Sequence, residues 1–173
     1  MLERAVMPDE QLDRAHWGAV EDVAEVLQEG QYQEALYQLR DIVQANPRNP
    51  YAYYFMGVAF YEIGRLPEAR DAFRAAVRLE PRYVGARGSL AQVLRRLRDY
   101  RGAIAEGKAT LALRNDDPDA LHALGMAHAA LGNRSDAKRY LEAFLRARSE
   151  YEAAQEVQMV LQLVEQGHGP VEL

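Results

Sequence analysis

Histidine, serine and carboxylate side chains could carry acid–base or nucleophilic chemistry in this sequence. The carboxylates are plentiful, but most lie on expected helix faces, where exposure to solvent explains them. His122 and His128 lie six residues apart in a segment with helical periodicity, whereas metal ligands on one helix are usually three or four residues apart. The hydroxyl side chains are Ser89, Ser135, Ser149 and Thr110, and none lies in a nucleophile-elbow sequence. There is no cysteine and no phosphate-binding glycine loop. The sequence therefore predicts no catalytic residue, no metal site and no cofactor.

Tyrosine and arginine offer a different chemistry, the recognition of another protein. Residues 51–61, YAYYFMGVAFY, are apolar or aromatic on nearly every side of a helix. A helix of that kind is either buried or keeps a face for a partner. Tyrosine gives a large contact area at a low cost in side-chain entropy, and arginine pairs with carboxylates through two parallel hydrogen bonds. A segment with an aromatic or aliphatic anchor and a nearby carboxylate would suit these residues.

The elements that position these side chains recur every 34 residues. Small residues mark the period, with one departure to arginine, at Ala35, Ala69, Ala103 and Ala137 and at Gly30, Gly64, Arg98 and Gly132. The period divides the chain into an N-terminal extension over 1–15 and four repeats over 16–49, 50–83, 84–117 and 118–151. Each repeat contains two apolar patterns of helical period with a short break between them, so it predicts a pair of antiparallel helices.

The repeats resemble tetratricopeptide repeats (TPRs), whose pattern is an aromatic residue, then x2-L-G-x2-Y, then A-x3-F and a proline. The second repeat has Tyr53-x2-Met56-Gly57-x2-Phe60, Ala69-x3-Phe73 and Pro81, and the fourth has Leu121-x2-Leu124-Gly125-x2-His128 and Ala137-x3-Leu141. The first repeat has Asp22-Val23 in place of Leu-Gly, and the third has Gly107 in place of the second aromatic residue. The resemblance implies a right-handed all-α solenoid that acts as a non-enzymatic adaptor, scaffold or chaperone-like protein, with His128 in a packing role.

The expected helices follow from this register and from proline signals. Asn49-Pro50 and Asp117-Pro118 are typical of an N-cap followed by a first-turn proline. We expect helices over 17–29, 31–45, 51–63, 66–79, 85–97, 99–113, 119–131 and 134–147. Gly102 and Gly107 make 99–113 the least stable of these internal helices.

The two ends lie outside the repeats. Residues 152–166 are amphipathic and predict a capping helix over the last repeat, followed by a flexible tail over 167–173. Residues 1–15 either extend the first helix backward from Asp9 or form a separate short helix, and Gly18 is compatible with a break.

In the TPR family the first helices line a concave groove, and the resemblance places the recognition residues there. The predicted peptide-binding groove contains Tyr51, Tyr54, Val58, Tyr61, Gln92, Arg95, Arg96, His122 and Met126. Some relatives clamp a chaperone's C-terminal carboxylate with lysine and asparagine, but the matching positions here are Val20, Ala24, Phe55, Gly85 and Ser89. We therefore do not expect that ligand. Two alternatives to a partner remain: the N-terminal segment, with Leu2, Val6, Met7 and Leu12, covers the tyrosines, or a second copy does.

Charge and hydropathy limit the partners further. The formal charge is −5, so we expect no binding of nucleic acid. No apolar run approaches 18 residues and no signal peptide is evident, so we expect no membrane insertion and a cytoplasmic location. Residues 1–30 hold eight acids and two bases, and residues 84–117 hold seven bases and four acids. Solvated helix faces explain most such charge, and the alternatives are self-association into a structural homo-oligomer or autoinhibition by the acidic N-terminus.

Overall fold

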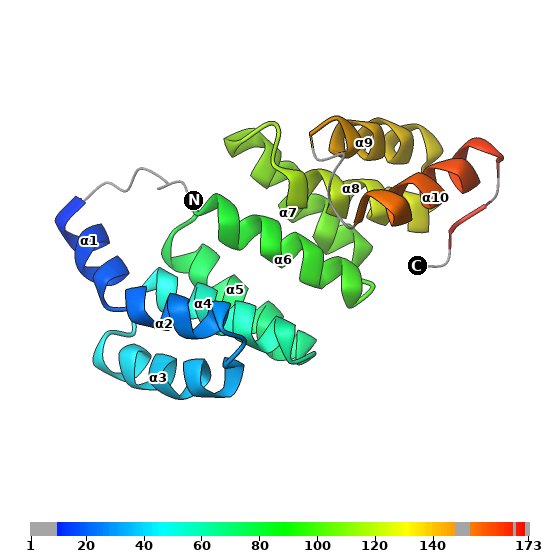
Figure 1. Cartoon of the computed structure of the whole chain (residues 1–173). Coiled ribbons are helices and arrows are strands. Elements are labelled where there is room, and N and C mark those ends of the chain that lie inside the picture. Colours follow the sequence, from blue (N-terminus) through cyan, green and yellow to red (C-terminus); the bar gives the residue numbers. More distant parts are fainter. Residues whose placement is uncertain (1–9, 148–152, 168, 172–173) are drawn as a thin grey trace. The chain divides into compact units, whose positions relative to one another are not determined.

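The computed structural model describes residues 10–147, 153–167 and 169–171 (Figure 1). Within these ranges the chain forms helices and no strand, which confirms the predicted all-α fold class. The helices are α1 Glu10–Gly18, α2 Glu21–Gln28, α3 Tyr32–Ala45, α4 Pro50–Glu62, α5 Leu66–Leu79, α6 Val84–Arg96, α7 Tyr100–Leu113, α8 Pro118–Ala130, α9 Arg134–Ala147 and α10 Ala153–Glu165. Met1–Ala86 and Arg87–Leu173 form two compact units, here called the N-terminal half and the C-terminal half, and each is described by itself.

From α3 onward the helix boundaries agree with the predicted ones to within one residue. At α4 and α8 the caps explain this agreement. Asn49 Oδ1 accepts hydrogen bonds from the backbone N–H groups of Tyr51 and Ala52, at 3.0 and 3.2 Å, and Pro50 opens α4. Asp117 Oδ1 accepts from the N–H of Ala120 at 2.9 Å and starts α8 in the same way. Each cap satisfies N–H groups that have no partner within the helix.

The first helix of the first repeat differs from the prediction. A single helix over 17–29 was expected, but a turn at Ala19 and Val20 separates α1 from α2. Of the two alternatives for residues 1–15, the separate short helix is therefore correct for the described residues. Trp17 consequently belongs to α1, whereas Val23 and Leu27 belong to α2, where both are buried.

The turns inside the repeats use a left-handed backbone conformation. Gly30, Gly64 and Gly132 have φ of 76°, 78° and 73°. Arg98 stands at the equivalent place in the third repeat and has φ of 62°. A residue other than glycine loses about 1 kcal/mol or more of folding free energy in this left-handed conformation. The third repeat therefore forms its turn at an energetic cost that the other repeats avoid.

In the N-terminal half, the pairing of α4 with α5 depends on Gly57. A Cβ atom at Gly57 would lie 2.6 Å from the Phe73 ring, which is closer than van der Waals contact permits. Phe73 is buried, and so is Ala69 one turn before it. The small residues of the 34-residue period therefore set how closely the two helices approach.

The C-terminal half repeats this device twice. A Cβ atom at Gly107 would lie 2.7 Å from Leu124 Cγ, so α8 fills the space that a large aromatic residue would occupy in α7. Gly125 of α8 packs in the same way against Leu141 of α9. An ion pair of 2.6 Å between Arg87 and Glu106 connects α6 to α7.

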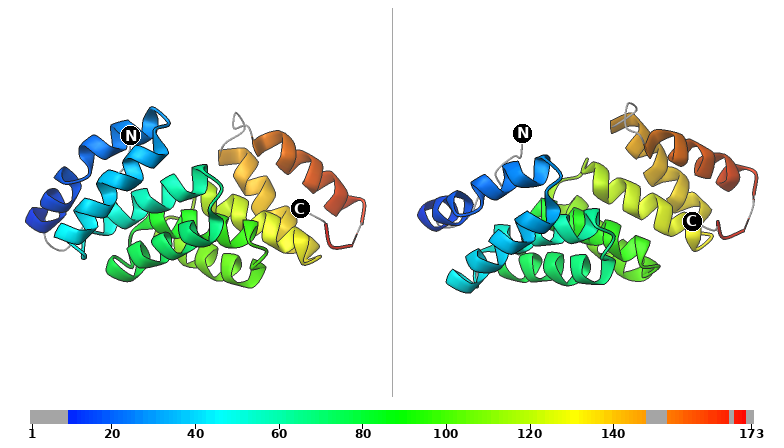
Figure 2. Two further views of the ribbon diagram at one scale, coloured as in Figure 1. Left: turned by 90° about the horizontal axis from the view of Figure 1, so that it is seen from below. Right: turned by 60° about the horizontal axis from the view of Figure 1, so that its bottom comes forward.

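Helix α10 caps the fourth repeat, and it lies beside α9 in both views of Figure 2. Its Val157, Val160 and Val164 are buried in one cluster with residues of α8 and α9. A flexible tail was expected over 167–173, and among its described residues Val171 contacts this half. The N–H of Val171 donates to the carbonyl of Ala129 at 3.1 Å.

Candidate functional site

The predicted recognition residues fall into two sets, one in each half. The aromatic patch lies on α4 and contains Tyr51, Tyr54, Val58 and Tyr61. The polar patch lies on α6 and α8 and contains Gln92, Arg95, Arg96, His122 and Met126. A groove that combines the two sets stays a prediction.

The aromatic patch follows one side of α4. Its members are three or four residues apart, and residues at this spacing share one face of a helix. Tyr54, Val58 and Tyr61 are half-buried, whereas Tyr51 is buried. Gly57 provides the close contact with α5, and Tyr54 also takes part in it, because its ring centroid lies 5.8 Å from that of Phe73.

Tyr83, which precedes α6, belongs with the aromatic patch and was missed by the sequence reasoning. Its ring centroid lies 5.0 Å from that of Tyr54 and 5.4 Å from that of Tyr51. Burial raises the pKa of Tyr83 well above its ordinary value, and the neighbouring Tyr54, Tyr51 and Asp13 raise it further. The side chain therefore keeps its proton. Its place in the loop that ends the second repeat gave no periodic signal.

Helix α1 covers one end of the aromatic patch. The Tyr51 hydroxyl donates a short hydrogen bond to Asp13 Oδ1. The Trp17 ring meets the Tyr51 ring edge-on, with centroids 5.4 Å apart, and lies 6.0 Å from the Phe55 ring. Residues 1–15 were expected to cover the tyrosines, and Asp13 does contact Tyr51. Leu2, Val6 and Met7 lie outside the described residues.

The polar patch is organised by the amide of Gln92. Its Nε2 donates to the backbone carbonyl of Asp119 at 3.0 Å and contacts His122 Nδ1 at 2.9 Å. Because a carbonyl can only accept, Nε2 is the donor in both contacts and His122 Nδ1 is an acceptor. Arg95 Nε donates to Gln92 Oε1 at 3.3 Å. The amide therefore connects α6 to α8 and orients Arg95 at the same time.

His122 is consequently a neutral imidazole whose proton is on Nε2. Burial lowers its pKa to about 4, and the positive charge of Arg95 acts in the same direction. Its Nε2 is buried and has no hydrogen-bond partner among the described residues. The ring lies 5.2 Å from Phe144. This histidine holds Gln92 in place and is not poised for acid–base catalysis near neutral pH.

The remaining members of the polar patch differ in exposure. Arg96 is exposed at the end of α6. Met126 is 0% exposed and belongs to the core cluster that includes Val157 and Val160 of α10. Met126 therefore belongs to the core that α8 forms with α9 and α10, and its side chain is not exposed at the surface.

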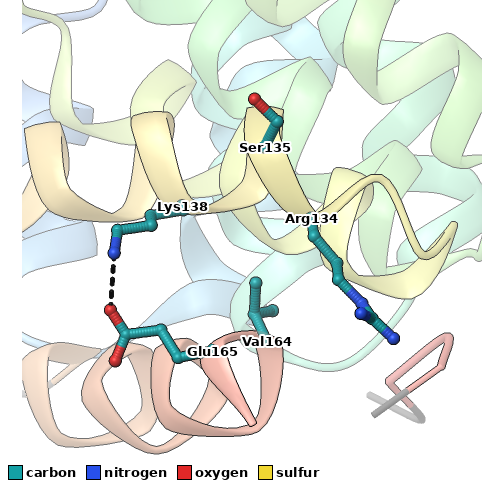
Figure 3. A pocket seen from close by; sticks show the side chains of 5 residues that line it. All are labelled: Arg134, Ser135, Lys138, Val164 and Glu165. Atoms are coloured by element: carbon teal, nitrogen blue, oxygen red, sulfur yellow. Dashed lines mark hydrogen bonds and ion pairs between the residues drawn. The ribbon is translucent and has the colours of Figure 1, made fainter. Parts of the chain in front are cut away.

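A shallow pocket at the far end of the C-terminal half was not predicted from the sequence. Arg134, Ser135 and Lys138 of α9 line it together with Val164 and Glu165 of α10 (Figure 3). Lys138 Nζ lies 2.8 Å from Glu165 Oε1. This ion pair neutralises the charge of Lys138 and joins α9 to α10. The pocket therefore lies at the contact between the capping helix and the last repeat.

The other buried histidine of this half is a packing residue, as the repeat pattern implies. His128 stacks on Tyr140 with ring centroids 5.7 Å apart, and its Nδ1 lies 3.3 Å from Asn133 Nδ2. In the part of the chain that the structure describes, no three histidine or acidic side chains are placed to hold a metal ion. None of the described helices is both long and apolar enough to cross a membrane.

Two family models match the sequence, and both describe a tetratricopeptide repeat. One matches residues 25–83 and 56–120, and the other matches residues 118–151. Together they extend over the second, third and fourth predicted repeats and part of the first. No curated protein sequence matches the chain at a significant level.

Solved structures of TPR proteins share the fold. A crystal structure of MamA has a TM-score of 0.76 at 17% identity, covering 88% of this chain and 81% of that one. MamA residues 41 to the end from Desulfovibrio magneticus RS-1 has a TM-score of 0.73 at 19% identity, with coverages of 88% and 90%. The first TPR of Spaghetti (RPAP3), bound to the HSP90 peptide SRMEEVD, has a TM-score of 0.61 at 20% identity, with coverages of 68% and 93%. At these identities the likeness concerns the fold.

Proposed function

This chain belongs to the tetratricopeptide repeat family, and we propose that it is a non-enzymatic protein–protein interaction module. In this proposal it acts as an adaptor or scaffold that binds a peptide segment of a partner protein on the first helices of its repeats. The observation that carries the proposal is the aromatic patch, because Tyr54, Val58 and Tyr61 keep partly exposed side chains along one side of α4.

The aromatic patch favours a partner that carries an apolar anchor residue. Tyr54 and Tyr61 are half-buried, so each presents part of a ring at the surface while the rest is fixed by neighbouring side chains. Tyr54 is held between Tyr83 and Phe73, with centroid distances of 5.0 and 5.8 Å. A ring that is already immobilised loses little entropy on binding, which is why such residues are frequent hot spots.

The polar patch favours a partner that also carries an acidic group. Gln92 fixes the position of Arg95, and Arg96 lies exposed at the adjacent position. Arginine held in one orientation binds carboxylates more specifically than a mobile cation does. The peptide SRMEEVD bound by the first TPR of Spaghetti (RPAP3) contains acidic residues, which supports a peptide as the class of ligand.

The test is a selection of random displayed peptides on the full chain, followed by titration of the recovered peptides on variants. Tyr54→Ala and Gln92→Ala should each weaken binding about tenfold or more, since each removes or releases one contact group. Tyr37→Ala is the matched control, because Tyr37 is 64% exposed on α3 and belongs to neither patch. Unchanged affinity in both patch variants, with melting temperatures near that of the native chain, would reject the proposal.

Self-assembly is the second candidate, and the distribution of exposed charge favours it. Glu21, Asp22 and Glu25 are exposed on α2, and Arg101 and Lys108 are exposed on α7. These two helices of opposite sign could pair between copies of the chain. The resulting contact would be heterologous, so it would generate rings or filaments instead of a closed dimer.

A further inference from the structure

Helix α1 lies outside the repeat pattern and yet is docked on a predicted recognition surface. The first repeat begins at residue 16 by the 34-residue register, so most of α1, Glu10–Gly18, belongs to no repeat. Its contacts with α4 involve the end of the aromatic patch that contains Tyr51. The helix therefore shows which chemistry this surface accepts.

Two side chains of α1 make a matched pair on one face. Asp13 and Trp17 are four residues apart, and such residues lie one above the other on a helix. Both contact Tyr51: the carboxylate accepts a hydrogen bond from its hydroxyl, and the indole packs against its ring edge-on, at a centroid distance of 5.4 Å and an angle of 89°. Phe55, one turn further along α4, is the second ring against Trp17. Tyr51 thus contacts a carboxylate and an aromatic ring at the same time.

A third contact comes from the backbone. Asn49 Nδ2 donates to the carbonyl of His16 at 2.8 Å, while Asn49 Oδ1 caps α4. Asn49 is fully buried, so its amide is held by both helices. The carbonyls in the last turn of a helix lack partners within the helix. Asn49 therefore recognises the C-terminal end of a helix without regard to its side chains.

Helix α1 is poorly supported apart from this contact. It has nine residues, and an isolated helix of that length is marginal in water. Its exposed side includes Arg14 and Ala15, and a turn at Ala19 and Val20 separates it from α2. Local opening of such a short helix costs less than unfolding of a repeat.

We propose that this end of α4 is a recognition site for a helical segment that carries a carboxylate and, four residues later, a large aromatic ring. Helix α1 is the chain's own occupant of the site, and a partner segment with the same pair displaces it. This inference rests on the proposed function, because it specifies the chemistry of the segment that the aromatic patch binds. Asn49, Tyr51 and Phe55 form the site, and α1 limits access to it.

The experiment uses a labelled peptide with the sequence of residues 10–20 and the full-length chain as its receptor. In the receptor, Trp17→Ala removes the ring by which the chain's own α1 occupies the site. The peptide should bind this receptor about tenfold more tightly than the native chain, because an occupied site reduces apparent affinity by the fraction that is open. Replacing the peptide's aspartate by asparagine, or adding Tyr51→Phe to the receptor, should each reduce affinity about tenfold, and the two changes together should cost little more than either alone.

Tyr53→Phe added to the same receptor is the matched control, since Tyr53 is half-buried on α4 and belongs to neither patch. Equal affinity for the two peptides, equal effects of Tyr51→Phe and Tyr53→Phe, or no binding at all would overturn the inference. If Trp17→Ala lowers the melting temperature strongly, Asp13→Asn serves as the receptor in its place. Displayed peptides that still bind through Tyr54 and Gln92 while the α1 peptide fails would reject this inference and leave the proposed function standing.

Discussion

Helices α4 and α8 occupy equivalent places in the second and fourth repeats, but their surroundings differ. Both have a glycine at the same repeat position, Gly57 and Gly125, against which a large side chain of the following helix packs. In α4 the face beyond that contact is aromatic and half-buried. In α8 every residue from Ala120 to Ala129 is buried, and α10 packs against this helix.

The difference teaches that pairing within a repeat and the use of its outer face are separate properties of the sequence. Pairing needs one glycine and one large apolar residue, and α4 and α8 both have them. The outer face is aromatic on α4, whereas on α8 it is rich in alanine and is closed by the capping helix. A ligand surface is therefore expected where aromatic side chains stay partly exposed, and a covered core is expected next to a cap.

Removal of the large partner should have the largest effect on both helix pairs. Phe73→Ala should lower the free energy of unfolding by about 4 kcal/mol and Leu141→Ala by about 3 kcal/mol, because each leaves a cavity against a glycine that cannot fill it. Urea denaturation of the full chain measures both. Leu113→Ala is the control, since Leu113 is 38% exposed and its truncation should cost less than about 1 kcal/mol. A small cost at only one of the two sites would show that the pairs are not equivalent.

Lowering the pH should affect the polar patch, through His122, more than the aromatic patch. The pKa of His122 is lowered to about 4 by burial, with Arg95 adding to the shift, so the folded chain favours the neutral ring. The stability that this contributes is complete above pH 6.5 and is lost as the pH falls through 4, with a loss of about 3 kcal/mol between pH 7 and pH 4. His122→Phe should remove most of this pH dependence from the free energy of unfolding. An NMR titration in which His122 protonates near pH 6.5 would contradict the prediction.

The sequence was sufficient for features that depend on neighbouring residues. The caps at Asn49 and Asp117 place the starts of α4 and α8, and the 34-residue period places the glycine and alanine contacts within each helix pair. The break after Gly18 was harder, because the first repeat lacks the Leu-Gly pair that would fix its register. Features that join distant segments could not be derived. The burial of Met126 depends on α10, and the contact between Gln92 and His122 joins residues 30 positions apart.

The turn of the third repeat offers a reciprocal test of a smaller effect. Arg98 has φ of 62° where the second repeat has Gly64 at 78°. Arg98→Gly should stabilise the chain by about 1 kcal/mol, and Gly64→Arg should destabilise it by a similar amount, because only glycine adopts this conformation without a steric penalty. No atom lies within 4 Å of a Cβ placed at Gly64, so the second change tests the backbone alone. Thermal unfolding of both variants measures the pair, and equal melting temperatures would mean that the turn carries no penalty.

Self-association through opposite charge should give the smallest effect per contact. Arg101 and Lys108 are seven residues apart on α7, and Glu21 and Glu25 are four apart on α2, so each pair forms an exposed stripe. Exposed ion pairs contribute at most about 1 kcal/mol each and are screened within about 8–10 Å near physiological salt. Sedimentation should therefore detect oligomers at low salt that dissociate as salt rises. Lys108→Glu should abolish them, and Glu25→Lys in the same chain should restore them, because the swap recreates the pairing with the signs reversed. A monomer at every salt concentration would rule out self-assembly as a function. The aromatic patch would then remain as the proposed surface by which this chain binds other proteins.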